Sequence, residues 1–362
     1  MAKVAIIYLV WSDEPKKYLA DALAGVAAQT YPKDKTALVI IYNSHRPEEP
    51  SCLEFIRATV AASDNLPETI ILPQSANLGF TGGNNAGLRW AADNGFDYAF
   101  LHNADGFLRP EAIERLVAVM EADKNIGQTQ ALILLHSEKE LINSAGNRWH
   151  YLGVGYCDLF RRPLAGVNLP PIKEIGYVSG AATLLRLDLV NRFGGLNPNF
   201  YLYHEDAEYS WRLKIRGFKT TLVSNAIFVH RYAFSRNPQK YYWLERNRQA
   251  VKLLLYRWPT LILLLPLEIL YGLALFLTSL FGGFTGALLR AWGYWLKAGN
   301  WSVWLAERKK YQAERRLNDR AILRLAAPTI DAGELVAQRP LVFLANLLFT
   351  FYYYFLKITV WW

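Results

Sequence analysis

Apolar and polar positions along the first third of the chain form a repeating pattern of strand and helix signals. Short, continuous apolar runs predict buried strands at 4–10, 36–42, 69–73 and 97–102. Helical spacing of apolar residues predicts helices at 18–29, 52–62, 88–92 and 110–122. This alternation predicts an α/β fold with a mostly parallel central sheet flanked by helices. Because ligands bind beyond the carboxyl ends of such strands, the loops after these four runs are the first candidates for a functional site.

The last third of the chain is dominated by long apolar segments. An apolar belt at 259–296 is interrupted only by Glu268 and Arg290. It is nearly twice as long as the ~20 residues that one bilayer span needs. The Gly-rich run at 281–286 lies in its middle and predicts a hairpin turn.

Two further segments follow the belt, a basic helix predicted at 301–326 and a terminal apolar segment at 340–362. We therefore predict a catalytic domain at 1–250 and a membrane-associated helical region at 251–362. Length and composition leave two alternatives for the apolar segments, which either span the bilayer or lie in its interface.

The net charge of +9 is concentrated in the same region. Residues 251–362 hold 13 Lys and Arg against 6 Asp and Glu, whereas residues 1–250 hold 27 against 25. A basic, aromatic-rich, apolar region favours a membrane surface as partner, and the near-neutral remainder argues against nucleic acid. The apolar run that starts at Val4 is too short for a secretion signal, so we place the globular part at the cytoplasmic face of the cell membrane.

The sequence HNADG at 102–106 is a polar, acidic turn directly after a predicted strand. A carboxylate at such a position can hold Mg²⁺ together with the phosphates of a substrate. The alternative is an ordinary turn, which Asn, Asp and Gly form readily.

The sequence NLGFTGGNNAGL at 77–88 predicts a Gly- and Asn-rich turn that leads into a helix. Backbone N–H groups in such a turn, with the start of a helix behind them, favour an anion such as phosphate. The segment has neither the Gly-Lys-Ser/Thr of a P-loop nor the GxGxxG of a dinucleotide site.

The sequence YLYHEDAEYSWRLKIRGF at 201–218 places an acidic pair, Glu205 and Asp206, between aromatic residues. A carboxylate in a partly buried, aromatic setting can serve as a general base, although a solvated helix start is the alternative. His230 follows another apolar run, where a lone histidine is more often structural than a ligand.

Taken together and in this order, these segments resemble the family-two glycosyltransferases of the A-type nucleotide-diphospho-sugar transferase fold. The resemblance is closest to the rhamnosyltransferase-like branch and covers nearly all of residues 1–250. It also includes VWSDEPKKYLADALAGVAAQTYP near the start, and IFVHRYAFS and YYWLERNR near the end. It implies an inverting transferase that moves a sugar, with rhamnose as one candidate, from a nucleotide-diphospho-sugar donor to a hydroxyl of a lipid-linked or cell-surface glycan. Such an enzyme serves the biosynthesis of cell wall or polysaccharide.

The resemblance also implies roles for single residues. Asp206 matches the catalytic base, and Glu205 beside it contacts the acceptor or the sugar. Asn103 and Asp105 match the two positions of the Asp-x-Asp motif that binds the metal, Mg²⁺ or Mn²⁺, and the diphosphate. His230 matches a histidine that can approach the metal or the diphosphate. The remaining positions on the donor side are Trp11, Tyr42, Asn43, Asn77, Gly79, Asn85 and Arg246.

Tyr42 departs from the family pattern, since the family usually ends its second strand with an Asp that binds the nucleobase. Tyr42 either stacks on the base or merely fills the strand end, while the amide of Asn43 can reach the base edge. Two other functions stay open, a glycosyltransferase that acts on polyisoprenyl phosphate and a membrane-anchored sugar-nucleotide binder without catalysis. The presence of Asp105 and Asp206 favours an enzyme over the latter.

Overall fold

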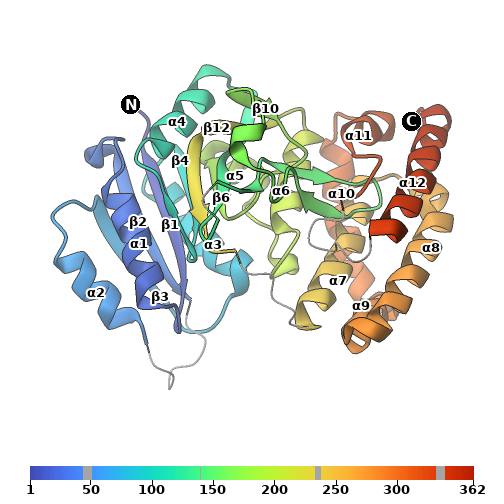
Figure 1. Cartoon of the computed structure of the whole chain (residues 1–362), viewed down its shortest axis with the longest axis horizontal. Helices are drawn as coiled ribbons and strands as arrows, with labels where there is room; N and C mark the ends of the chain where they lie inside the picture. Colours follow the sequence, from blue (N-terminus) through green and yellow to red (C-terminus); the bar gives the residue numbers. More distant parts are fainter. Residues whose placement is uncertain (44–50, 139, 233–237, 332–338) are drawn as a thin grey trace. The chain divides into compact units, whose positions relative to one another are not determined.

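A computed structural model describes residues 1–43, 51–138, 140–232, 238–331 and 339–362 (Figure 1). The chain forms two compact units. The first consists of Met1–Asn147, Cys157–Tyr209 and Lys219–Tyr232. The second consists of Arg148–Tyr156, Ser210–Phe218 and Ala233–Trp362.

The first unit is built on a mixed sheet in the order β10-β12-β6-β11-β4-β1-β2-β3, with β5 paired to β12 and β7 to β6. Its strands are β1 (Val4–Trp11), β2 (Thr36–Asn43), β3 (Glu68–Gln74), β4 (Tyr98–Asn103), β5 (Gly106–Leu108), β6 (Ile126–Leu135), β7 (Ile142–Ser144), β10 (Ile172–Glu174), β11 (Ala182–Arg186) and β12 (Lys219–His230). β1 to β4 are parallel, as the sequence predicts, and β12 is parallel to β6. β11 is antiparallel to both of its neighbours, β4 and β6.

Helices cover both faces of this sheet. Successive side chains of β1 point to opposite faces, so each face packs against a different set of helices. Ile6 and Tyr8 belong to a buried cluster with side chains of α1 (Lys16–Ala27), α2 (Leu53–Ala61) and α4 (Ala112–Ala122). Ile7 and Leu9 point the other way, towards α3 (Gly79–Asp93). The unit also contains α5 (Leu187–Phe193) and the short helices η1 (Lys33–Lys35), η2 (Leu164–Gly166) and η3 (Pro198–Phe200). The helix α6 (Glu205–Lys214) and the hairpin of β8 (Asn147–Trp149) with β9 (Gly155–Cys157) contribute residues to both units.

The predicted turn at 77–88 is instead the first half of α3, which begins at Gly79. A Cβ atom at Gly83 would lie 2.4 Å from a methyl of Leu9, and one at Gly87 would lie 2.5 Å from a methyl of Ile7. The glycines therefore form a smooth stripe that lets α3 pack closely on β1. This tertiary contact outweighs the poor helix propensity of glycine, which costs about 1 kcal/mol per residue relative to alanine.

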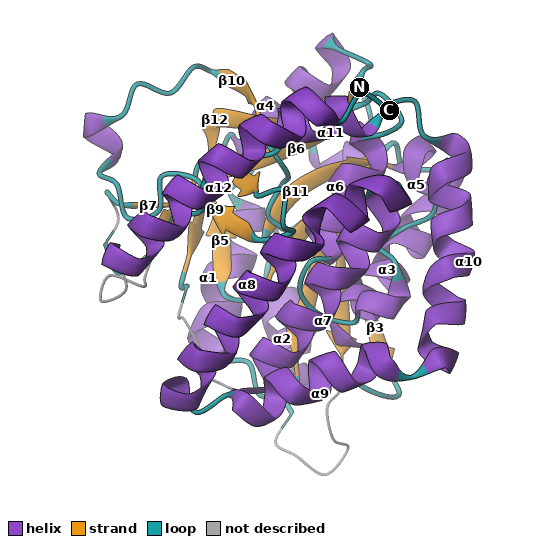
Figure 2. Cartoon of the chain, turned by 90° about the vertical axis from the view of Figure 1, so that its right-hand side faces the viewer, coloured by secondary structure: helices purple, strands orange, loops and turns teal. Residues whose placement is uncertain are grey.

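The second unit is helical, with α7 (Pro238–Leu255), α8 (Trp258–Gly282), α9 (Thr285–Leu296), α10 (Ala298–Glu314), α11 (Asp319–Leu325) and α12 (Arg339–Thr359) (Figure 2). At 259–296, where the sequence predicts an apolar belt or hairpin, the structure has α8 and α9, which are joined at Gly283 in the left-handed conformation. The predicted single helix at 301–326 is wrong. It is divided into α10 and α11, because the side chain of Asn318 caps a new helix by accepting a hydrogen bond from the amide of Ala321 at 2.9 Å.

Two helical segments are long and apolar enough to cross a membrane, Trp258–Gly282 and Val342–Thr359. α8 and α12 lie side by side in both views (Figures 1 and 2). The hydroxyl of Tyr352 donates a hydrogen bond to the carbonyl of Leu263, and the indole of Trp362 donates to the hydroxyl of Thr260 at 2.9 Å.

The units do not divide at residue 250, where the sequence predicts the domain boundary. Two short earlier segments, 148–156 and 210–218, belong to the helical unit. The hydroxyl of Tyr151 donates to the carbonyl of Phe349 at 2.8 Å, and Arg216 forms an ion pair with Glu314 at 2.6 Å. Both contacts lie within the helical unit, so the segments 148–156 and 210–218 belong with the C-terminal helices.

A chain that ends at Arg257 should consequently not fold as an independent catalytic domain. Removal of α8 to α12 would expose the buried Val251, Leu254 and Leu255 of α7, and burial of each such side chain contributes about 1.5–3 kcal/mol to a total stability of about 5–15 kcal/mol. We expect aggregation and no cooperative thermal unfolding, measured against the full chain in detergent. A soluble truncated chain with a sharp unfolding transition would contradict this prediction.

Candidate active site at the carboxyl edge of the sheet

Six of the described strands, β1, β2, β3, β4, β6 and β12, run in the same direction, and five of them end in a polar or aromatic residue at one edge of the sheet. Their last residues are Trp11 of β1, Asn43 of β2, Gln74 of β3, Asn103 of β4 and His230 of β12. Most of the residues predicted from the sequence follow or form these strand ends. The edge is therefore the candidate active site, as the parallel topology predicts.

Asp105, Asn103 and His230 form one polar cluster at this edge. Nε2 of His230 lies 2.9 Å from Oδ1 of Asp105, and the amide nitrogen of Asn103 donates to the same oxygen at 2.6 Å. The Asp105 side chain is 33% exposed, whereas His230 is nearly buried. Burial acts to raise the pKa of Asp105. The hydrogen bond and the attraction from His230 act in the opposite direction and, with the other hydrogen bonds, hold the pKa below its usual value.

The orientation of His230 suits a cation beside Asp105. Nδ1 of His230 lies 2.9 Å from Oδ1 of Asn143 and can donate its proton there, which leaves a lone pair on Nε2. That lone pair lies 3.3 Å from the amide nitrogen of Asn103, which can donate to it, and it is directed to the side of Asp105 on which a metal ion could bind. Among the described residues no three His, Cys, Asp or Glu side chains gather as metal ligands. Two ligands completed by phosphate oxygens fit the usual binding of Mg²⁺ or Mn²⁺.

Two residues that the sequence analysis did not select also belong to this cluster. Glu14 follows β1, and its pKa is raised to about 7, first by burial and then by repulsion from Asp105 and Asp13. Arg231 donates its backbone N–H to the carbonyl of Asp105 at 2.8 Å. Its side chain forms an ion pair with Asp21 and lies over the ring of Tyr18. The sequence offered one signal that Glu14 belongs to the site, namely its position shortly after the first strand.

The backbone directly before β11 brings Asp206 to the same edge. Asp206 accepts a hydrogen bond from the amide of Gly180 at 3.0 Å, and the next residue, Ala181, accepts one from the amide of Asn103, also at 3.0 Å. The Asp206 side chain also accepts from the amide of Ala207 at 2.7 Å. Burial raises the pKa of Asp206 to about 6, which suits a base that acts near neutral pH.

The loop before Asp206 has an unusual backbone. Tyr201, Tyr203 and His204 all have positive φ angles, of 63°, 64° and 67°. Such conformations cost of order 1–3 kcal/mol each in non-glycine residues and cluster at functional sites. The carbonyl of Tyr201 accepts a hydrogen bond from the amide of Thr81 at 3.2 Å, which ties this loop to the start of α3.

Glu205 is 5% exposed, and burial, followed by repulsion from Asp206, raises its pKa well above the usual value. Within the described part of the chain, its Oε2 has no hydrogen-bond partner. A buried carboxyl group with a free oxygen can bind a hydroxyl of a sugar or an acceptor. The structure therefore places both acidic residues of the predicted pair at the start of α6, beside the strand ends.

The side chains of several predicted donor-binding residues form hydrogen bonds within the protein. Asn43 is fully buried. Its side chain accepts from the amide of Leu78 at 2.9 Å and donates to the carbonyl of Gly79 at 3.2 Å, so its amide does not reach a base edge. Asn77 accepts from the amide of Gly79 at 2.8 Å. Asn85 exchanges two hydrogen bonds with the backbone of Leu196, at 2.7 and 2.9 Å.

Gly79 has a structural role at the junction of α3 and the loop. Its φ angle is +69°, and a Cβ atom there would lie 2.7 Å from the ring and the carbonyl of Tyr201. The amide groups of Gly79 and Thr81 are already used by Asn77 and Tyr201. The expected phosphate contact of this segment therefore does not arise from these two amides.

Tyr42 is 6% exposed and belongs to the buried cluster beneath α1 and α2. Its hydroxyl lies 2.8 Å from the hydroxyl of Ser51. This burial favours the alternative in which Tyr42 fills the strand end over stacking on a base. Trp11 is partly exposed at the end of β1. Arg246 belongs to the helical unit, where its guanidinium lies 4.6 Å from the ring centre of Trp243 and 5.1 Å from that of Tyr294.

Comparison with known proteins gives a family match over most of the chain. The family described as glycosyltransferase-like family 2 matches residues 4–251. The undecaprenyl-phosphate mannosyltransferase of Micrococcus luteus is 30% identical over 136 residues, which cover 36% of this chain and 51% of that protein. The chain thus aligns with about half the length of this curated relative.

Solved structures match the fold at low sequence identity. The crystal structure of GalNAc-T7 with UDP, GalNAc and Mn²⁺ has a TM-score of 0.52 and 15% identity, and the match covers 65% of this chain and 44% of that one. It confirms the predicted A-type fold. A crystal structure of S. aureus TarS 1–349 matches 99% of this chain and 90% of that one, with a TM-score of 0.48 and 12% identity.

The cluster of Asp105 and His230 predicts a measurable cation site. Asp105→Ala should weaken Mn²⁺ binding in the presence of a nucleoside diphosphate by at least about tenfold, or 1.4 kcal/mol, because the carboxylate is the only anionic member of this pair. Electron paramagnetic resonance of free Mn²⁺ gives the affinity directly. Asp123→Ala is the matched control, since Asp123 is bound to Lys219 on the surface. Equal affinities in the two variants would assign the metal to other ligands.

Proposed function

Because the chain belongs to the glycosyltransferase-like family 2, we propose that it is an inverting, metal-dependent glycosyltransferase. It moves a sugar from a nucleotide-diphospho-sugar to a hydroxyl of a lipid-linked or cell-surface glycan. One observation carries the proposal. The β4–β11 ladder sets a carboxylate with a raised pKa, Asp206, beside the Asn103–Asp105–His230 cluster.

Asp206 is the group that removes the proton from the attacking hydroxyl. Its two oxygens accept hydrogen bonds from the amides of Gly180 and Ala207, which fix the direction of the carboxylate. With a pKa of about 6 it is ionised at pH 7, yet it is basic enough to hold a proton as the nucleophile attacks. Glu205 contributes its free oxygen to binding of the sugar or the acceptor.

Asp105, Asn103 and His230 bind the diphosphate end of the donor. A divalent metal ion held by Asp105 and His230, when bound, acts as a Lewis acid that offsets the negative charge of the leaving nucleoside diphosphate. Asn143 holds the His230 ring in the required orientation. Glu14 and Arg231 lie at the same cluster and adjust its charge.

Two candidate reactions differ in the acceptor that receives the sugar. The resemblance to the rhamnosyltransferase-like branch favours the extension of a lipid-linked glycan in polysaccharide or cell-wall biosynthesis. The likeness to an undecaprenyl-phosphate mannosyltransferase supports the second candidate, direct transfer to a polyisoprenyl phosphate. Thin-layer chromatography of the lipid product distinguishes one sugar on a monophosphate carrier from an extended glycan.

The helical unit offers a surface for a membrane. Exposed apolar side chains lie on α8 (Ile262, Leu265, Ile269, Leu273, Leu277 and Leu280) and on α12 (Phe343, Leu344, Leu347, Phe351 and Ile358). We call this set the apolar face. It supports association with a membrane, and we place the protein at the cytoplasmic face of the cell membrane, next to the lipid carrier of its acceptor.

The same unit favours helices that lie in the interface over helices that span the bilayer. Glu268, in the middle of α8, forms ion pairs with Arg248 and Lys252 of α7, so the charged α7 lies along the inner side of α8. α9 has 12 residues and is about 18 Å long at 1.5 Å per residue, too short for a hydrocarbon core of about 30 Å. A spanning α8 would carry these charges into the membrane.

Substitution of the base tests the chemistry. Asp206→Asn should lower the transfer rate by about 10²–10⁴-fold, while donor binding stays within about twofold because the base acts on the acceptor. The wild-type rate should fall about tenfold per pH unit below about pH 6, since protonation removes the base, and be flat above it. Asp188→Asn, at an exposed carboxylate paired with Arg186, is the control. More than about a tenth of the wild-type rate in Asp206→Asn would exclude Asp206 as the base.

One cysteine at the start of α8 and one at the start of α9, just beyond the far end of α8, test the membrane arrangement. In a chain with Cys52→Ser and Cys157→Ser, we introduce Pro259→Cys or Gly286→Cys, both at exposed positions. An impermeant maleimide should label both from the same side of sealed, oriented membrane vesicles. Labelling from opposite sides would show that α8 spans the bilayer.

A further inference from the structure

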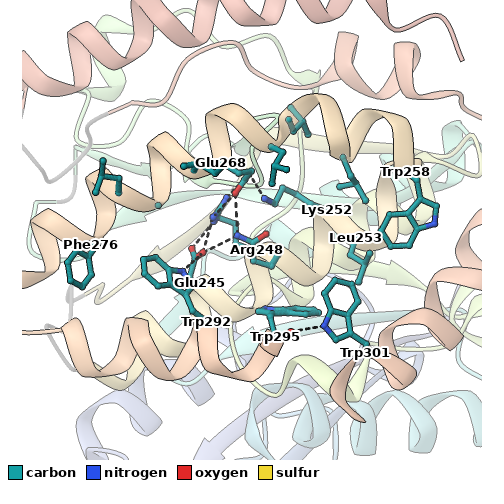
Figure 3. Close-up of a pocket in the computed structure, with 17 residues that line it drawn as sticks. Glu245, Arg248, Lys252, Leu253, Trp258, Glu268, Phe276, Trp292, Trp295 and Trp301 are labelled. Atoms are coloured by element: carbon teal, nitrogen blue, oxygen red, sulfur yellow. Dashed lines mark hydrogen bonds and ion pairs between the residues drawn. The ribbon is translucent and has the colours of Figure 1, made fainter. Parts of the chain in front are cut away.

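A cavity of about 710 Å³ lies among α7, α8 and α9 in the helical unit, with Trp301 of α10 at one end (Figure 3). This volume falls within the range of about 300–1,000 Å³ that is usual for ligand sites. None of the residues of the candidate active site lines it.

Four charged residues form the floor of the cavity. Arg248 contacts Glu245 at 2.8 Å and Glu268 at 3.1 Å, and Lys252 forms an ion pair with Glu268. Figure 3 shows Glu268 reaching from α8 towards the two cations on α7. The side chains of Arg248, Lys252 and Glu245 are at most 5% exposed, and that of Glu268 is 14% exposed.

The charges of this floor compensate one another. Two cations face two carboxylates, and Gln249 donates further hydrogen bonds to both carboxylates, at 3.1 and 3.3 Å. An anionic headgroup would have to displace Glu268 from both of its cations, and breaking a buried pair costs about 3–5 kcal/mol. The floor is therefore a neutral, saturated surface and not a phosphate site.

The walls of the cavity are apolar and aromatic. Trp292 and Trp295 of α9 and Phe276 of α8 face the space, as Figure 3 shows. Leu265, Ile269 and Leu273 line the cavity and also belong to the exposed apolar face of α8. The cavity is thus continuous with the surface that we assign to the membrane, and a hydrocarbon chain can enter it without crossing water.

We propose that this cavity binds one hydrocarbon chain of the lipid carrier to which the acceptor glycan is attached. The identity of this carrier rests on the proposed function, whereas the binding of a chain follows from the cavity itself. Apolar walls recognise the chain by burial of its surface, at about 25 cal/mol per Å². The saturated ionic floor holds α7 and α8 at a fixed separation and keeps the space open.

Gly272 allows the cavity to be filled without disturbing its walls. A Cβ atom at Gly272 would lie 3.7 Å from the ring of Trp292, an ordinary contact distance, so a leucine there projects into the open space. Gly293 of α9 is the matched control, because nothing lies within 4 Å of its Cβ position and it does not line the cavity. Both changes replace a helical glycine by leucine and gain a similar helix propensity.

The experiment uses the full chain in phosphatidylcholine nanodiscs without donor. A photoactivatable farnesol is cross-linked, and the labelled peptides are identified by mass spectrometry. Labels should concentrate on the inner side of α8 and on α9. Gly272→Leu should lower this labelling at least about fivefold, and Gly293→Leu should leave it within about twofold, as expected for loss of a shape-matched site. Unlabelled farnesol and farnesyl phosphate should compete within about threefold of each other, since the chain is recognised.

Three results would overturn the proposal. Labelling spread evenly over α8 and α12 in both variants would mean contact with bulk lipid only. Absence of concentrated labelling in these phosphatidylcholine nanodiscs would mean that an ordinary membrane lipid occupies the cavity. Competition by farnesyl phosphate alone would make the floor a headgroup site. Labelling that is intact in a protein unable to transfer sugar would refute the proposed function and leave the cavity assignment standing.

Discussion

The candidate chemistry depends on the insertion of β11 into the sheet as an antiparallel strand between β4 and β6. Its register pairs Ala182 with His102, which sets residues 179–181 beside the end of β4. The amide of Asn103 and the carbonyl of Ala181 form one rung of this arrangement, and the amide of Gly180 binds Asp206. Two acidic residues that lie 101 positions apart, Asp105 and Asp206, are thus positioned by backbone hydrogen bonds. A register shift by one residue would reverse every side chain of β11.

The sequence allowed most of the first half of the sheet to be predicted, because buried parallel strands are continuous apolar runs. The strands predicted at 4–10, 36–42, 69–73 and 97–102 agree with β1 to β4 to within about a residue at each end. β11 was not predicted, since five residues carry little periodicity and its partners lie more than 50 residues away along the chain. The start of α3 was missed because Gly83 and Gly87 have poor helix propensity. Their value lies in contact with β1, which no local pattern reveals.

The candidate site, like the fold, could be predicted only in part. Asp105, His230 and Asp206 were found through motifs, and the structure places them at one edge of the sheet. The amides of Asn43 and Asn85 were assigned to the donor, yet they bind backbone groups of the protein itself. An Asn side chain can donate and accept in any direction, so its partner depends on tertiary structure. Glu14 is the reverse case, a carboxyl group whose proximity to Asp105 appears only once β1 and β4 are paired.

Glu268 shows why apolar length alone overestimates membrane spans. In the sequence it is a single interruption of a 38-residue belt, and in the structure it is the residue that joins α8 to α7. A buried ion pair of this kind contributes little net stability, because desolvation of the charges offsets their attraction. What it does provide is a fixed separation between two helices whose apolar side chains do not fill the space between them. The same carboxylate thus binds α8 to a charged partner, opposes its insertion across a bilayer and leaves a cavity open towards the apolar face.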